Sequence, residues 1–176
     1  MISRYSELFK PLCECSLQGY LGRGVHTLGL LRWILEQTGK ADVYVSTFST
    51  SDDFLSGFFR LKKEGLIGES FLLADLKAAG KTLQLAILMK NCFTKVCLAP
   101  NHSKIVLVSN ESHKVTVISS QNQTYGDRHE STVIMTDSIT FDTFYRQFMN
   151  IIDKSVNIDA ILERHQSVKR SAEDNN

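Results

Sequence analysis

The sequence lacks a strong excess of charge of either sign. Twenty Lys and Arg residues face nineteen Asp and Glu residues, so the formal net charge is +1 over 176 residues. This balance excludes a global positive field, and any attraction for phosphate must come from a local cluster. Hydrophobic residues make up 43% and charged residues 22% of the chain. These proportions and this length indicate one ordinary globular domain.

Long apolar runs are also missing. The most apolar stretch, residues 28–35, is short and carries Arg32, so it cannot span a bilayer. The first 24 residues are broken by charged side chains and contain no apolar core of the length found in signal peptides. We therefore expect a cytoplasmic protein that does not engage a membrane.

Cysteines are few and are not spaced as metal ligands. One residue separates Cys13 from Cys15, and four residues separate Cys92 from Cys97. Neither gap matches the two-residue spacing of common zinc sites. In a reducing compartment they are expected to be free thiols, and we predict that they act as small buried hydrophobes. The sequence therefore predicts no metal site and no cofactor.

The patterning predicts an α/β fold. Strands alternate with helices in the first half, a hairpin follows, and a last strand leads into an amphipathic helix. Such an order predicts a mixed β-sheet flanked by helices on both faces. We expect one domain over residues 1–166 and a polar, disordered tail at 167–176. Glycines at 19, 22 and 24 predict a loop there, and Thr27 is the expected N-cap of the next helix. The predicted strands are 41–48, 70–75, 94–98, 104–108, 115–119 and 131–136, and the predicted helices are 3–15, 27–37, 51–64, 82–91, 138–152 and 158–165.

Residues with chemical potential gather between 101 and 137. His102 and Lys104 precede a predicted strand, where alternate side chains share a face. A lysine supplies positive charge to phosphate oxygens, and an imidazole can attack phosphorus or move a proton. Ser120 and Asn122 follow the next strand and share a face by the same rule, so they offer neutral donors to a developing phosphorane. We expect these four side chains to meet across the hairpin.

A carboxylate follows on the next predicted strand. Glu130 is suited to orienting an imidazole through its second ring nitrogen. Taken singly, each pattern has an ordinary explanation: a surface His–Lys pair, a turn at Ser-Ser-Gln-Asn, and a solvated ion pair in Arg-His-Glu. A solvated turn is likewise the simpler role for the hairpin tip. Further candidate contacts to a substrate are Ser119, Gln121, Arg128, His113 and Lys114.

In their order and spacing these motifs resemble the phospholipase D superfamily, and most closely its short members with one catalytic motif per chain, such as small bacterial endonucleases. The family pattern is His-x-Lys-(x)4-Asp, then Gly-Ser-x-Asn and a later Glu, and the resemblance covers roughly residues 41–152. It implies that His102 is a nucleophile that forms a phosphohistidine and that Lys104, Ser120 and Asn122 hold the phosphate. Glu130 would orient the histidine of a partner subunit. Because the family uses two such histidines, a single motif implies a homodimer with a shared site and no need for a metal.

Two positions depart from the family pattern. Ser109, with Asn110 beside it, stands where the family has its aspartate, and Ser119 replaces the glycine before the Ser-x-Asn motif. The family's aspartate is largely structural, so Ser109 does not by itself abolish the chemistry. Ser119 has less backbone freedom than glycine, which bears on how closely a phosphate approaches.

These observations predict a metal-independent phosphodiesterase, specifically a nuclease that acts on nucleic acid, with DNA favoured. Two alternatives remain open. One is a nonenzymatic nucleic-acid-binding or assembly module that keeps the fold, an interpretation that the missing aspartate supports. The other is a phospholipid phosphodiesterase, which is the least favoured because the chain has no Lys- and Arg-rich amphipathic segment.

Overall fold

The computed structural model describes residues 4–76, 79–124 and 126–163, with the side chains of 79–83 excepted. Helices and strands alternate up to residue 99, and a hairpin, a strand and a long helix follow. The elements are α1 (Arg4–Leu8), β1 (Leu17–Gly22), α2 (Thr27–Thr38), β2 (Ala41–Thr47), α3 (Asp52–Lys63), β3 (Ile67–Asp75), α4 (Ala79–Cys92), β4 (Lys95–Ala99), β5 (Ile105–Ser109), β6 (Lys114–Ser119), β7 (Glu130–Met135), α5 (Ser138–Lys154) and β8 (Val156–Asn157).

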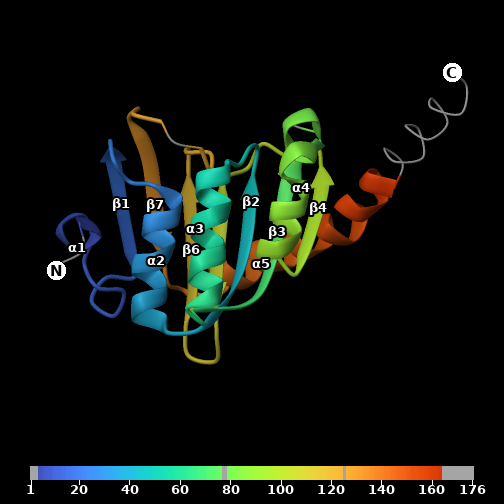
Figure 1. Ribbon diagram of the computed structural model, residues 1–176. Coiled ribbons are helices and arrows are strands. Elements are labelled where there is room, and N and C mark those ends of the chain that lie inside the picture. Colours follow the sequence, from blue (N-terminus) through green and yellow to red (C-terminus); the bar gives the residue numbers. More distant parts are fainter. Residues whose placement is uncertain (1–3, 77–78, 125, 164–176) are drawn as a thin grey trace, which may run out of the picture.

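All strands belong to one mixed sheet of eight strands in the order β1-β7-β6-β5-β2-β3-β4-β8 (Figure 1). β2, β3 and β4 run parallel to one another, and the remaining neighbours are antiparallel. The parallel strands are joined by α3 and α4, because a connection between parallel strands must cross the length of the sheet. The mixed α/β sheet predicted from the sequence is confirmed.

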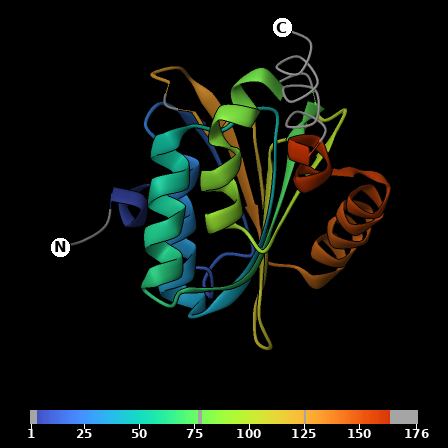
Figure 2. The same cartoon turned by 45° about the vertical axis from the view of Figure 1, so that its right-hand side comes forward.

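Helices cover both faces of the sheet, as predicted (Figure 2). α2, α3 and α4 lie on one face, where their apolar side chains pack with Val43 and Val45 of β2. α5 lies on the other face, and its Phe148 packs against Tyr44 of the same strand. Alternate residues of β2 therefore face opposite helical layers, which explains why this strand is almost wholly buried.

The face that carries α5 is only partly covered. On strands β1, β7 and β6, five apolar side chains share this face and are exposed or half-buried. They share it because residues directly opposite one another in an antiparallel pair point the same way. Leu17 and Leu21 are 64% and 78% exposed. We call this surface the open face; it consists of Leu17, Leu21, Ile118, Val133 and Met135.

The structure corrects three predictions for the first third of the chain. The glycine-rich stretch is a strand rather than a loop: Gly19 and Gly22 lie in β1, paired with β7. Because β7 lies far from β1 in the sequence, the residues around β1 give no indication of this pairing. The first helix ends at Leu8 instead of reaching residue 15, as Pro11 disfavours a longer helix. The N-cap of α2 is His26, not Thr27.

Cysteine burial agrees with the prediction for only one pair. Cys92 and Cys97 are buried, and burial raises the pKa of the Cys92 thiol to about 11. Cys13 is exposed and Cys15 is half-buried, so the first pair does not belong to the core. The predicted tail at 167–176 lies outside the described residues. Within the described ranges, no helix is both long and apolar enough to cross a membrane.

Candidate functional site

One edge of the sheet collects the predicted site residues. The parallel strands β2, β3 and β4 all end there, β6 ends there, and β5 and β7 begin there. The segment with His102 enters β5 at this edge, and Glu130 is the first residue of β7. Ligands of open α/β sheets commonly bind beyond the carboxyl ends of the parallel strands. The topology therefore places the candidate site at a favourable edge.

The segment that carries His102 is anchored on both sides of the histidine. Asn101 donates its backbone N–H to Asp75 Oδ2 at 2.7 Å, and its side-chain amide donates to Ser46 Oγ at 3.0 Å and to the Thr47 carbonyl at 3.1 Å. Ser103 donates from its hydroxyl to Asn101 Oδ1 at 2.7 Å. The ends of β2 and β3 therefore fix the backbone around His102. This role of Asn101 was not predicted from the sequence, where the available signal was an amide side chain between a predicted strand and the His-x-Lys motif.

His102 and Lys104 lie together, as their spacing predicted. Lys104 Nζ is 3.3 Å from His102 Nδ1 and donates to the His102 carbonyl at 2.8 Å. The imidazole is exposed and lies against the ring of Phe48, with 5.2 Å between ring centroids. An ammonium group beside an accessible imidazole supplies both charge for phosphate oxygens and a nitrogen that can reach phosphorus.

A second pair forms at the same edge. Ser120 donates from its hydroxyl to Glu130 Oε2, and the same hydroxyl accepts the Ser131 N–H at 3.0 Å. The Glu130 side chain is 15% exposed, and Arg128 Nε lies 3.8 Å from its Oε1. In the described part of the chain, Glu130 makes no hydrogen bond to His102. The carboxylate is therefore held by neighbours in its own chain.

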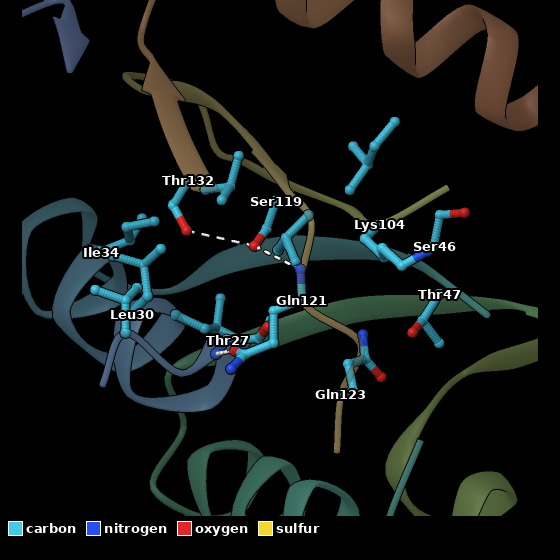
Figure 3. Close-up of a pocket in the computed structure, with 15 residues that line it drawn as sticks. Thr27, Leu30, Ile34, Ser46, Thr47, Lys104, Ser119, Gln121, Gln123 and Thr132 are labelled. Carbon is cyan, nitrogen blue, oxygen red and sulfur yellow. Dashed lines mark hydrogen bonds between the residues drawn. The ribbon is translucent and has the colours of Figure 1, made fainter. Parts of the chain in front are cut away.

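The hairpin register decides which side chains face Lys104. Ile105 pairs with Ile118, and Ser119 donates its N–H to the Lys104 carbonyl at 3.0 Å. Opposite residues share a face, so Ser119 and Gln121 lie on the Lys104 side (Figure 3). By the same alternation, Ser120 and Asn122 point to the opposite face of the sheet from Lys104. These two side chains therefore lie at the same edge of the sheet as Lys104 but not on the same face, although the sequence had predicted that they meet.

A small cavity lies below Lys104. Its volume is about 20 Å³, and Ser46, Thr47, Ser119 and Thr132 contribute polar groups to its wall. Figure 3 shows these side chains around it, between α2 and the sheet. A cavity of this size holds about one water molecule. It therefore has no room for a molecule much larger than water.

Gln121 ties the segment after β6 to the start of α2. Its Oε1 accepts the Thr27 N–H at 3.2 Å, and its Nε2 lies 3.3 Å from His26 Nδ1. The N-cap residue His26 makes no side-chain cap of its own, so Gln121 satisfies one of the free amides of the first turn. This long-range cap was not predictable from the local sequence.

The hairpin tip lies at the far edge of the sheet. β5 separates it from His102 by a strand length of roughly 14 Å at 3.4 Å per residue. Lys114 Nζ contacts Asp142 Oδ1 of α5 at 2.7 Å and lies 5.8 Å above the ring of Phe141. His113 contacts Asn110 within the hairpin. The geometry assigns these two residues to the packing of the hairpin and not to the His102 edge.

The position of the family aspartate also lies at this far edge. Ser109 is the last residue of β5 and pairs with Asp42 of β2 and Lys114 of β6. Asn110 accepts the N–H groups of Ser112 and His113 at 3.0 and 2.8 Å and donates to the Thr38 carbonyl at 2.8 Å. Asn110 therefore closes the hairpin and ties it to the end of α2. This is structural work of the kind expected of the aspartate.

In the described ranges, no group of three or more His, Cys, Asp and Glu side chains is placed to hold a metal ion.

Comparisons with known proteins give structural relatives only. No protein-family model and no curated protein sequence matches the chain. Among solved structures, Nuc from Salmonella typhimurium, a phospholipase D family member, superposes with a TM-score of 0.61 at 14% identity over 80% of this chain and 97% of its own. NucT from Helicobacter pylori gives a TM-score of 0.61 at 14% identity over 80% of this chain and 99% of its own. The archaeal chromatin protein TrmBL2, whose structure shows a mode of DNA binding, gives a TM-score of 0.51 at 8% identity over 86% of this chain and 58% of its own.

Proposed function

Since the chain has a phospholipase D-like fold, we propose that it is a phosphodiesterase that cleaves nucleic acid through His102, without a metal ion. One observation carries the proposal: an exposed imidazole lies 3.3 Å from a lysine ammonium, at the sheet edge where Ser120 and Glu130 also meet. The structural relatives include Nuc, a phospholipase D family member, and NucT. Their likeness supports the fold, and the pairing of His102 with Lys104 supports this class of reaction among those that the fold can host.

The proposed reaction has two displacements. The imidazole of one His102 attacks phosphorus and forms a P–N bond, while the P–O bond to one nucleotide breaks. The leaving oxygen takes a proton from the His102 of a second copy. That second imidazole then removes a proton from water, which attacks the phosphohistidine and restores the first His102. Lys104 neutralises the phosphate oxygens and Asn122 donates to them, whereas the Ser120 hydroxyl donates to Glu130 and holds this carboxylate in place.

A second copy of the chain is part of the proposal, because one chain supplies one such histidine. The open face supports this association: Leu17 and Leu21 are largely exposed, and Leu21 pairs with Ser131, next to Glu130. Exposed apolar patches on proteins are typical of interaction surfaces. Glu130 precedes Ser131 on β7, so packing two open faces together brings the site edges of the two copies toward each other.

The first test is cleavage of labelled single- and double-stranded DNA and RNA in excess chelator. We expect the wild type to cut and the His102→Ala variant to lose at least about 100-fold in rate, because it lacks the attacking nitrogen. His113→Ala is the matched control at the far edge and should keep the wild-type rate. Equal cutting by His102→Ala, or cutting that requires a divalent ion, would overturn the proposal.

The shared site has its own test. Wild-type and excess His102→Ala chains are unfolded together, refolded and assayed with substrate in excess over total protein. A mixed dimer holds His102 in only one of its two chains. Activity per wild-type chain should therefore fall steeply as the variant is added. Constant activity per wild-type chain would show that each chain acts alone.

A nonenzymatic DNA-binding role is the second candidate. The likeness to the chromatin protein TrmBL2 supports it, and so does the loss of the family aspartate at Ser109. If neither the wild type nor His102→Ala cuts any substrate while both bind DNA with affinity that falls as salt rises, this second function replaces the first.

A further inference from the structure

One aromatic side chain lies outside the apolar core on either face of the sheet. Among the residues that the structure describes, every other Phe, Tyr and Trp side chain packs within one of two apolar clusters. Phe48 belongs to neither cluster and is half-buried. Its ring lies against the imidazole of His102, with 5.2 Å between the ring centroids and 56° between the ring planes. Packing of the core therefore does not account for an aromatic residue at this position.

The backbone on both sides of Phe48 is held in place. Phe48 directly follows β2, and the carbonyl of the last β2 residue, Thr47, accepts the side-chain amide of Asn101 at 3.1 Å. Asn101 immediately precedes His102, so this bond joins the segment of Phe48 to the segment of His102. The Thr47 hydroxyl donates to the Ser49 carbonyl at 2.8 Å, across Phe48. The ring of Phe48 therefore stands on a backbone that is fixed relative to His102.

The imidazole of His102 has few other restraints. It is exposed, and in the described part of the chain the only side chain that approaches its ring nitrogens is Lys104, whose Nζ lies 3.3 Å from Nδ1. Lys104 does not hold the ring during the proposed reaction, because its ammonium group then neutralises the phosphate oxygens. An exposed side chain changes rotamer within nanoseconds, whereas attack requires the reacting atoms to be held in line at about 3 to 3.5 Å. The contact with Phe48 remains when Lys104 binds the phosphate.

We propose that Phe48 is a positioning residue for His102. Its flat ring lies against the imidazole and restricts rotation about the side-chain bonds of His102, which keeps the ring oriented for attack on phosphorus. The inference rests on the proposed function and adds to it a residue that acts through the histidine. Loss of the Phe48 ring should therefore lower the rate of the bound complex and leave the binding of substrate nearly unchanged.

The first arm of the test compares cleavage by the wild type, Phe48→Leu and Phe48→Tyr. Leucine keeps an apolar side chain without the flat ring, so kcat should fall by about tenfold or more while KM stays within about twofold. Tyrosine keeps the ring and should retain the wild-type kcat. Phe59→Leu is the matched control, because Phe59 is a half-buried aromatic residue in the second half of α3, beside Lys63.

The kinetic outcome is decided on folded proteins, verified by their melting curves. Phe59→Leu should keep the wild-type kcat. An unchanged kcat in Phe48→Leu overturns the proposal, and so does a loss of kcat that Phe48→Tyr shares, because the ring is then not the group that matters.

The second arm does not depend on cleavage. An aromatic ring shifts the NMR signals of protons close to it, so the ring protons of His102 should give shifted signals, identified by their absence in His102→Ala. In Phe48→Leu these signals should move to the positions of free histidine, and in Phe59→Leu they should stay. Signals that do not move in Phe48→Leu overturn the proposal. A wild type that cuts no substrate contradicts the proposed function, and the NMR signals then still decide whether Phe48 holds His102.

Discussion

The two faces of the sheet are built for different purposes. On one face, α2, α3 and α4 enclose a continuous apolar core in which residues such as Phe58 and Leu35 are fully buried (Figure 2). On the other face, α5 covers Tyr44 and its neighbours, whereas Leu17 and Leu21 of the open face stay largely exposed. We call the face covered by α2, α3 and α4 the closed face; it holds most of the buried core, whereas the open face leaves apolar area exposed. This difference suggests substitutions that separate stability from association.

The largest effect on stability is expected on the closed face. Phe58 is 0% exposed and stacks on Phe93 with 4.2 Å between ring centroids. Phe58→Ala should lower the free energy of unfolding by about 3 to 5 kcal/mol, because it removes buried area and leaves a cavity. Urea unfolding measures the change. Ile139→Ala, at an 80% exposed position of α5, is the control and should change stability by less than about 0.5 kcal/mol. Similar losses for both would contradict the assigned core.

A smaller effect is expected where the closed face meets the site edge. Ser51 caps α3 by accepting the Phe54 N–H at 3.3 Å, and it donates to the Gln123 carbonyl at 2.9 Å. Ser51→Ala should cost about 1 kcal/mol of unfolding free energy. Ser138→Ala lies in the first turn of α5, where Asp137 is the cap, and thermal unfolding should show no comparable loss. If Ser51→Ala leaves the free energy of unfolding unchanged, the Ser51 cap is not formed.

The smallest effect on stability is expected on the open face, together with the largest effect on association. The double variant Leu17→Ser with Leu21→Ser should keep unfolding free energy within about 0.5 kcal/mol per substitution, since both side chains are exposed. Light scattering should show the wild type at twice the mass of one chain and the variant at the mass of one chain, with nuclease activity lost. A wild type that is monomeric and active would contradict the role of the open face.

Much of the architecture was predictable from periodicity. β2, β3 and β4 are rich in β-branched and apolar residues, and their boundaries came within about three residues. β1 was missed, because Gly19 and Gly22 give it the composition of a loop and only pairing with β7 makes it a strand. Local propensity carries little information where tertiary pairing decides the conformation.

The site was predictable in its residues more than in its arrangement. His102 and Lys104 came together through alternation within one segment. The relation of Ser120 and Asn122 to Lys104 depends on the hairpin register, and a shift of one residue moves every side chain to the other face. The sequence does not encode this register locally. The cap that Gln121 provides for α2 joins residues 94 positions apart, which no sequence window contains.

The central claim is that His102 becomes covalently attached to phosphorus during cleavage. The most direct measurement incubates the protein with an oligonucleotide carrying radioactive phosphate at the cleaved linkage, stops the reaction in alkaline denaturant and examines the protein for label. A P–N bond survives alkali and breaks in acid, so acid treatment identifies it. We expect acid-labile label on the wild type and none on His102→Ala. A wild type that cleaves the oligonucleotide under the same conditions without ever carrying label would contradict the account.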